Sequence, residues 1–562
     1  MFGSRVGGSS GIHHAPDRDM HRGGGGGQDR QQYIGSSSAS QLEHIGKLRT
    51  KDVRAGTELR ITVANDDDLY LRAHSKIPDT FATAEIFGME LVMGHEYKIE
   101  RGTSVAIFTW HGCTIEMRGP TTMEYDATNQ SMRDYVNLAG VIEQKRQRAE
   151  EMGGSSAPPR VLITGSENSG KSTLGVFLAN FSLRKHRRPI YVELDPGSFS
   201  AHRQLPSIPG TVSAIHIDHS AFELNQEPVH PNRINLHKTI DQGAQAAHLN
   251  PDYPIGKSVS FFYGYENWSD SPEVYWKCIA QLACLVGAKE DLIETQWAVE
   301  KAGNLGITAD GMRLENPSKG GIIVNCPKNP NPQLLDEIVR LYNINTVVVI
   351  EDESKFMHFV NKYNKGVIPQ IPTSGGADDL LKSGGGKSAN ALVFLDAIEE
   401  DEEGTASGDS SVDIAHVPRA GGVISFDKEG IFHIKLADYF HGPERDLVCH
   451  NFAIPLRELF ISAIRVAPSA AAAGSSWKEK YALVPFNEPI VKLRHSILAV
   501  VLAPTHEEVV MSTVTGLVWV REITDHDDPI NATLHIMCPS AGSLMSNYLL
   551  YGDLDNLKYY EQ

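Results

Sequence analysis

Apolar and polar residues alternate in short segments from Leu42 to about Tyr125. Glycines such as Gly88 and Gly102 interrupt this alternation at intervals of about 8 to 12 residues, which is typical of successive β-strands joined by turns. The segments with the clearest two-residue period are Glu58 to Val63, Leu69 to Arg72, Thr103 to Trp110 and Cys113 to Met117. The pattern predicts a small all-β domain in this part of the chain.

A different pattern begins after the Gly/Ser/Pro stretch that ends at Pro159, where short apolar runs alternate with segments of helical spacing. The helical segments start at Lys171, near Glu273 and at Gln333. The β-type runs are Val161 to Thr164, Ile190 to Leu194, Val259 to Tyr263, Gly321 to Asn325 and Thr346 to Glu351. Strands that alternate with helices in this way build a parallel sheet with helices on both faces, so the central part is predicted to be an α/β domain.

Shifts in composition suggest where the domains begin and end. Residues 1–40 are rich in Gly and Ser and hold few large aliphatic side chains, so we predict a disordered tail. Residues 41–126 form the predicted all-β domain, residues 127–442 the central domain and residues 443–562 a C-terminal α+β domain. We also predict a disordered insertion at about 374–418, where Gly, Ser and acidic residues dominate.

Charge and cysteine content exclude several function classes. The chain has 562 residues and a net charge of −18, so long-range electrostatics oppose indiscriminate binding to nucleic acid and any RNA contact is expected to be a local patch. The six cysteines include no Cys-x-x-Cys pair, which predicts free thiols without disulfides or a structural metal site. Apolar runs such as Ser496 to Ala503 are too short for a membrane span, and we expect neither secretion nor membrane insertion.

The strongest chemical signal is a phosphate-binding loop between a predicted strand and a predicted helix. Its sequence is Gly165-Ser166-Glu167-Asn168-Ser169-Gly170-Lys171-Ser172, which fits G-x-x-x-x-G-K-[ST] in full. In such loops backbone N–H groups wrap the phosphates, the lysine contacts the β- and γ-oxygens, and the final hydroxyl binds Mg²⁺. Thr173 adds an N–H for the α-phosphate. The chain has no Asn-Lys-x-Asp string after a strand, so a GTPase is set aside.

Asp195 is the candidate carboxylate for this loop. It follows the apolar run Ile190 to Leu194 and would lie beside the loop if the two strands were neighbours, where it could hold Mg²⁺ or act as a base. A turn or helix cap before Pro196 and Gly197 is the alternative interpretation.

Three other motifs are interpreted as structural. His216 and His219 lack a third cluster at metal-binding spacing and are taken as surface or core histidines. The string Trp110-His111-Gly112-Cys113 predicts a hairpin. The cations from Arg184 to Arg188 complement the dipole of the helix after the loop, with contact to RNA or phosphate as the alternative.

Several strings together resemble a known family. In the central domain they are Gly165 to Thr173, Arg187 to Asp195 and Ser207 to Thr211. In the N-terminal domain they are Thr57 to Arg60, Ala84 to Gly88 and Val105 to Cys113, and Tyr439 to Gly442 marks the boundary to the C-terminal domain. The combination resembles the Clp family of polynucleotide 5′-hydroxyl kinases and kinase-like mRNA cleavage and polyadenylation factors.

This resemblance implies an N-terminal β-sandwich, a central P-loop domain and a C-terminal domain. It also implies ATP as the nucleotide, with Glu58 near the adenine, Lys171 on the phosphates, and Ser172 with Asp195 on Mg²⁺. A second adenine-side position, usually lysine in the family, falls on Ser104. The remaining residues of the expected ATP site are Gly165, Asn168, Ser169, Gly170 and Thr173.

Parts that active kinases of the family use are altered in this chain. Asp195 matches their catalytic base, but Ser198 replaces the Gln of its usual context, so we interpret Asp195 as vestigial. Their Thr-x-Gly-Trp element, which clamps the RNA end, is replaced by Asn325-Cys326-Pro327-Lys328-Asn329-Pro330, which has no aromatic residue. Lys435 and Ala437 stand where two lid arginines are expected.

The resemblance therefore implies a subunit of the nuclear pre-mRNA 3′-end cleavage and polyadenylation machinery. Such a protein would hold ATP and Mg²⁺ as a structural ligand, dock on the large scaffold subunit of the cleavage factor, and contact RNA indirectly or weakly. An active ATP-dependent polyribonucleotide 5′-hydroxyl kinase is the alternative.

Overall fold

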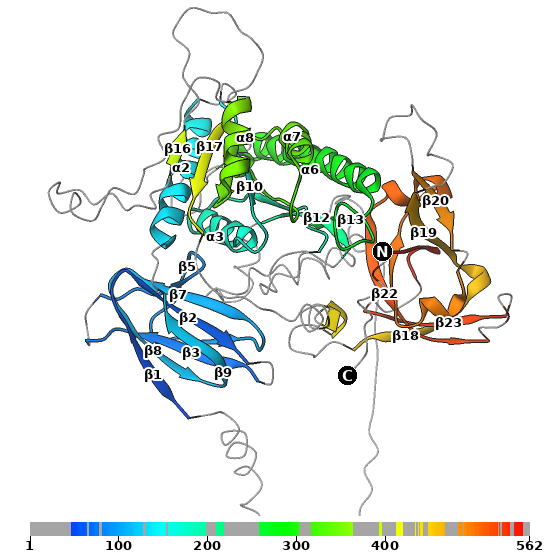
Figure 1. The fold of residues 1–562 in the computed structure, drawn as a ribbon, viewed down its shortest axis with the longest axis horizontal. Coiled ribbons are helices and arrows are strands. Elements are labelled where there is room, and N and C mark those ends of the chain that lie inside the picture. The colour runs from blue at the N-terminus through cyan, green and yellow to red at the C-terminus, as the bar shows by residue number, and fades with distance from the viewer. Residues whose placement is uncertain are drawn as a thin grey trace, which may run out of the picture. The chain divides into compact units, whose positions relative to one another are not determined.

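The computed structural model is shown as a ribbon in Figure 1. It describes residues 47–64, 67–77, 81–127, 131–152, 156–197, 210–217, 258–302, 316–363, 393–395, 412–419, 433, 436–437, 439–441, 448–466, 481–486, 488–525, 528, 531–539, 544–552 and 554. The predicted tail at 1–40 lies outside these residues, as does most of the insertion predicted at about 374–418.

The N-terminal part is a β-sandwich, which confirms the predicted all-β domain. One sheet has the order β1-β8-β3-β6 and the other β5-β4-β7-β2-β9. The strands are β1 (Arg49–Val53), β2 (Thr57–Val63), β3 (Leu69–His74), β4 (Glu85–Ile86), β5 (Met89–Glu90), β6 (Glu96–Ile99), β7 (Ser104–Thr109), β8 (Cys113–Arg118) and β9 (Thr121–Asp126). Alternate residues of each strand, such as Leu69 and Leu71, are buried between the sheets.

The turn from Trp110 to Gly112 joins the two sheets and does not close a hairpin. β7 pairs with β2 and β4, whereas β8 pairs with β1 and β3, so the predicted hairpin is wrong. Gly112 has a φ of 87°, and a Cβ there would lie 3.4 Å from the Ala55 nitrogen. Local alternation marked both strands correctly, but their partners are distant in sequence and the pattern carries no information about them.

The central domain is built on one sheet with the order β13-β12-β11-β14-β10-β15-β17-β16. Its strands are β10 (Arg160–Gly165), β11 (Ile190–Glu193), β12 (Thr211–His216), β13 (Ser258–Phe262), β14 (Ile322–Asn325), β15 (Thr346–Ile350), β16 (Val393–Leu395) and β17 (Asp413–Val417). The strands from β11 through β17 in this order run parallel, as predicted. At the margins β12 and β16 are antiparallel to their neighbours, so the sheet is mixed there.

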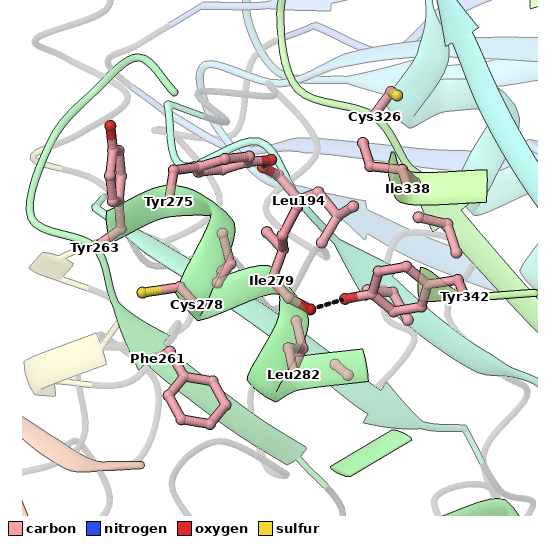
Figure 2. Packing of buried hydrophobic residues seen from close by; sticks show 14 of the residues in the cluster. Leu194, Phe261, Tyr263, Tyr275, Cys278, Ile279, Leu282, Cys326, Ile338 and Tyr342 are labelled. Carbon is pink, nitrogen blue, oxygen red and sulfur yellow. Dashed lines mark hydrogen bonds between the residues drawn. The ribbon is translucent and has the colours of Figure 1, made fainter. Parts of the chain in front are cut away.

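Helices cover both faces of this sheet. They are α2 (Ser131–Glu151), α3 (Lys171–Arg184), α6 (Pro272–Ala302), α7 (Pro332–Leu341) and α8 (Glu353–Tyr363), with the 3₁₀ turn η2 (Pro317–Lys319). On β10, Leu162 joins the core formed with α6, α7 and α8, while Val161 and Ile163 join the core formed with α2 and α3. Figure 2 shows the first of these cores, where the Tyr342 hydroxyl donates to the Ile279 carbonyl of α6 at 3.0 Å.

The disordered insertion predicted at about 374–418 is wrong for two segments, because β16 and β17 lie inside it. β17 pairs in parallel with all five residues of β15, and Ile414 and Val417 are buried. The five-residue strand follows a long stretch of Gly, Ser and acidic residues. The composition of that stretch dominated the prediction and hid the short apolar strand.

The C-terminal part contains a sheet with the order β18-β23-β22-β21-β24-β19-β20. Its strands are β18 (His450–Pro455), β19 (Phe460–Val466), β20 (Tyr481–Pro485), β21 (Ile497–Val501), β22 (Val514–Thr524), β23 (Thr533–Cys538) and β24 (Tyr548–Tyr551), with 3₁₀ turns η3 (Leu456–Glu458), η6 (Ile490–Leu493) and η7 (His506–Met511). On β21, Ala499 packs in the same core as α6, whereas Leu498 and Val500 pack on the opposite face. Of the helices in the described ranges, none combines the length and the apolar character that a membrane span requires.

A buried ionic cluster joins α2 to the segment after α3. Glu143 of α2 accepts hydrogen bonds from Arg187 at 2.7 and 2.9 Å and from Arg146 at 3.2 Å, and Glu150 accepts one from Arg187 at 2.7 Å. Burial alone would lower the pKa of Arg187, but the two carboxylates outweigh it and raise that pKa. Arg187 therefore has a structural role. Arg184, at the end of α3, pairs with Glu85 of the sandwich at 3.0 Å.

Candidate functional site

The phosphate loop lies between β10 and α3, which is the strand-loop-helix context that the motif requires. Gly165 has a φ of 155° and a Cβ there would lie 2.6 Å from the Ile350 carbonyl oxygen, so only glycine fits at this position. Asn168 and Gly170 adopt left-handed conformations at φ values of 55° and 94°. The backbone therefore turns sharply into α3, so the N–H groups at the start of that helix converge on the loop.

Lys171 is buried within this loop. Its Nζ donates to the Ser166 carbonyl at 2.9 Å, which folds the side chain back over the loop. Burial lowers the pKa of Lys171, while the charges of Asp195 and Glu193 oppose that shift. The ammonium group is therefore held where an anionic ligand would stabilise its charge.

A polar network ties the loop to the neighbouring strands. The side-chain amide of Asn325, at the end of β14, lies 3.1 Å from the Ser172 hydroxyl oxygen and donates to both carboxylate oxygens of Glu193 at 2.9 Å. Glu193 ends β11, is buried, and also accepts the backbone N–H of Asp195 at 3.1 Å. The network therefore fixes Ser172 and the Asp195 backbone relative to each other.

Sequence reasoning left Glu193 and Asn325 out of the candidate site. Each is a polar residue at the carboxyl end of an otherwise apolar, fully buried parallel strand. That signal was available, since carboxyl ends of parallel strands are where open α/β sheets bind ligands. The strands of Asp195 and the loop are not direct neighbours, because β14 lies between β11 and β10. The charge of Asp195 nevertheless acts on Lys171, and its Oδ1 accepts the Gly197 N–H at 3.2 Å.

The segment after β14 lies against the segment after β11. Lys328 Nζ donates to the Gly197 carbonyl at 2.6 Å, and the Lys328 carbonyl accepts the indole N–H of Trp268 at 3.0 Å. The half-buried Trp268 ring packs against the core beside Tyr275, with ring centroids 6.3 Å apart. Burial raises the pKa of the Cys326 thiol to about 12, so this cysteine is not a thiolate nucleophile at neutral pH.

The two adenine-side candidates lie in the sandwich. Glu58 is buried on β2 and accepts a hydrogen bond from Arg60 at 2.5 Å, and the Ser104 hydroxyl on β7 lies 3.1 Å from that of Thr62. In the antiparallel register Ser104 is opposite Thr62, so it stands about 13 Å along the strands from Glu58. The structure does not bring these two side chains together. Of the two lid positions, Ala437 is described, in a helical segment, and Lys435 lies outside the described residues.

The loop fits a nucleoside triphosphate with Mg²⁺. Ser169 Oγ and Asn325 Oδ1 are buried and have no hydrogen-bond partner among the residues that the structure describes. A Cβ at Gly170 would meet no atom within 4 Å, so the start of the helix is open to a ligand. Backbone N–H groups and Lys171 would hold phosphate, and Ser172 with Asp195 would hold Mg²⁺, which proteins commonly bind through few side chains plus phosphate oxygens.

Models of one family match three successive parts of the chain. They are described as the N-terminal beta-sandwich domain of polyadenylation factor over residues 52–149, the mRNA cleavage and polyadenylation factor CLP1 P-loop over residues 165–296, and Pre-mRNA cleavage complex II protein Clp1 over residues 448–559. The chain belongs to the Clp1 family of mRNA cleavage and polyadenylation factors. This confirms the resemblance recognised in the sequence.

Curated relatives carry two kinds of name within the Clp1 family. The Protein CLP1 homolog of Arabidopsis thaliana is 26% identical over 90% of this chain and 94% of its own length, and that of Nematostella vectensis is 24% identical over 89% and 94%. The Polyribonucleotide 5'-hydroxyl-kinase Clp1 of Xenopus laevis is 39% identical, over 33% of this chain and 39% of its own length.

Two solved Clp1 structures share the fold. One, titled as a wild-type Clp1p-Pcf11p complex, has a TM-score of 0.63 at 18% identity and covers 92% of this chain and 99% of its own. The other has a TM-score of 0.64 at 17% identity and covers 92% and 100%. Its title concerns the interface between Pcf11p and Clp1p and the structural basis for ATP loss in a glycine-to-arginine mutant.

Proposed function

We propose that this Clp1-family protein is an ATP-binding subunit of the nuclear pre-mRNA 3′-end cleavage and polyadenylation machinery, in which ATP and Mg²⁺ act as a structural ligand. One observation carries the proposal: beside a complete phosphate loop, the segment that stands where active members carry their RNA clamp is bonded through Lys328 to the Gly197 carbonyl. Glu58 and Ser104 remain the proposed adenine-side positions.

The nucleotide side has the parts that tight binding needs. Lys171, Ser172 and the glycines of the loop are in place, and the Asn325–Glu193 network holds Ser172 without any contribution from RNA. Preorganised groups lose little conformational entropy on binding, so they favour a slowly exchanging ligand.

The acceptor side supports a structural role over a kinase role. Phosphoryl transfer needs an acceptor hydroxyl placed in line with the γ-phosphate. Lys328 stands in the segment where active members carry the clamping tryptophan, and its amino group is bonded across to Gly197. Trp268 is close by, but its half-buried ring packs against the core and its N–H is bonded to the Lys328 carbonyl, so its position is fixed by the fold.

Protein purified without added nucleotide is expected to contain ATP and Mg²⁺. After the ligand is stripped, ATP at 100 times its dissociation constant should stabilise the fold by about 2.7 kcal/mol, because it binds only the native state. Nucleotide extraction with chromatography and a thermal-shift titration measure both effects. Lys171→Ala should abolish the shift, while Lys185→Ala, an exposed lysine just past the same helix, should keep it. Absence of bound nucleotide together with absence of any ATP-induced shift in the wild type contradicts the proposal.

The central domain is proposed to dock the large scaffold subunit of the cleavage factor. A solved Clp1 relative is titled as a complex with Pcf11p, which supports docking to a partner subunit, and the choice of the central domain follows from the family resemblance. Cross-linking the full chain to the scaffold subunit, followed by mass spectrometry, should place most cross-links within residues 127–442. Cross-links confined to the sandwich or to the C-terminal sheet overturn this placement.

A further inference from the structure

One end of the β-sandwich exposes large aromatic side chains. Phe81 is 74% exposed and Trp110 37% exposed. The Phe81 ring meets His111 edge-on at a centroid distance of 4.7 Å, and Trp110 meets buried Phe108 in the same way at 4.7 Å. Thr83 Oγ1 accepts the Trp110 backbone N–H at 3.2 Å and lies 3.2 Å from His111 Nδ1. The rings are therefore held in place by the fold, while Phe81 is largely exposed to solvent and Trp110 partly exposed.

Three exposed cationic residues lie on segments next to the turn that follows Trp110. The turn that contains Arg54 abuts Gly112, since a Cβ on that glycine would lie within 4 Å of Arg54 and Ala55 backbone atoms. Arg133 of α2 reaches the same turn, where its Nη2 would lie 3.3 Å from a Cβ on Gly56. Lys76 lies close enough to Cys113, the residue after Gly112, for the lysine charge to act on the thiol. We call this surface the sandwich-end patch; its members are Arg54, Lys76, Phe81, Trp110, His111 and Arg133.

The charge of the patch differs from that of the whole chain. The net charge is −18, yet Arg54, Lys76 and Arg133 are all exposed at this end. Asp52, an exposed acid on the adjoining strand, accepts a hydrogen bond from Thr114 at 2.6 Å. Exposed aromatic rings rimmed by cations are the arrangement with which proteins bind single-stranded nucleic acid, because bases stack on the rings and phosphates pair with the cations.

We propose that the sandwich-end patch binds single-stranded RNA, with nucleobases stacked on Trp110 and Phe81 and phosphates paired with Arg54, Lys76 and Arg133. This goes beyond the proposed function, because the surface lies on a different domain from the phosphate loop and acts without phosphoryl transfer. The three cations of the patch make a local positive surface, so contact with RNA is compatible with a strongly acidic chain.

The test is fluorescence anisotropy of a labelled ten-residue oligouridine with the full chain. Trp110→Ala and Phe81→Ala are each expected to weaken binding about 5- to 150-fold, the loss of one base stack. Phe81 is the more exposed of the two, so Phe81→Ala keeps the test valid if the tryptophan variant unfolds. The dependence of log affinity on log salt should have a slope of about −2 for three neutralised phosphates and about −0.7 in the Arg54→Ala/Arg133→Ala variant.

Matched controls are Phe460→Ala and Arg340→Ala, which remove an exposed aromatic and an exposed cation elsewhere and should leave RNA affinity unchanged. Equal RNA affinity in patch variants and wild type overturns the proposal. A patch variant that loses both RNA binding and the ATP-induced thermal shift also overturns the proposal, because the rings would then contribute to nucleotide binding. A third contrary result is a Phe81→Ala protein that loses the scaffold subunit but keeps its RNA affinity, which would assign the patch to a protein partner.

Discussion

No appreciable phosphorylation of RNA 5′-hydroxyl ends is expected from the purified protein. Lys171, Ser172 and Asp195 supply the positioning of the γ-phosphate and Mg²⁺, but the acceptor must also be aligned and the developing charge stabilised. Loss of a base-stacking aromatic costs about 1 to 3 kcal/mol, and loss of arginines that stabilise the phosphoryl group costs several kcal/mol more. If the two losses are independent, the rate is expected to be at least about 10⁴ below that of an active relative.

The measurement is transfer of label from γ-labelled ATP to a 5′-hydroxyl RNA, with Lys171→Ala as the background control. Label transfer at a rate comparable to an active relative, abolished by Lys171→Ala, would falsify this prediction and establish the kinase alternative. A complementary test restores the missing groups in one chain through Lys328→Trp, Lys435→Arg and Ala437→Arg. Lys328→Trp also removes the amino group that bonds to the Gly197 carbonyl, so it should open the acceptor side as well as supply a ring.

Replacement of Glu143 by alanine is expected to destabilise the central domain by about 3 to 5 kcal/mol, the usual cost of leaving a buried charge without its partner. Glu143 is bonded to both Arg146 and Arg187, whose side chains are 2% exposed. Arg146 would lose this carboxylate, and its hydrogen bonds to the Gly320 carbonyl and the Ser182 hydroxyl go to uncharged groups. Thermal and denaturant unfolding of the full chain measure the effect.

Glu151→Ala is the matched control for this substitution, because Glu151 lies on the same helix with its side chain exposed. A surface change of this kind should alter stability by no more than about 0.5 kcal/mol. Glu143→Gln keeps the shape and one hydrogen-bonding oxygen and should fall between the two. If Glu143→Ala and Glu151→Ala have the same free energy of unfolding, the prediction is wrong. The ionic cluster then adds no more stability than well-packed neutral side chains would.

Much of the fold could be predicted because its signals are local. The alternation of polar and apolar residues in the first domain, and of strands and helices in the second, depends on neighbours within about ten residues along the chain. The phosphate loop is the clearest case, since its turn, its lysine and its hydroxyl are contiguous between β10 and α3. Prediction was wrong where a short signal lay in a biased context, as with β17 at Asp413–Val417.

Only the tertiary structure decided which distant residues complete the site. Asn325 reaches Ser172 across 153 positions of sequence, and Lys328 reaches Gly197 across 131. These contacts exist because β14 inserts between β11 and β10, an order that follows from which buried faces pack together and not from any local pattern. The same reason explains the turn after Trp110, whose strands join different sheets. The sequence by itself determined the phosphate loop and the family. Long-range strand pairing decided which residues surround that loop.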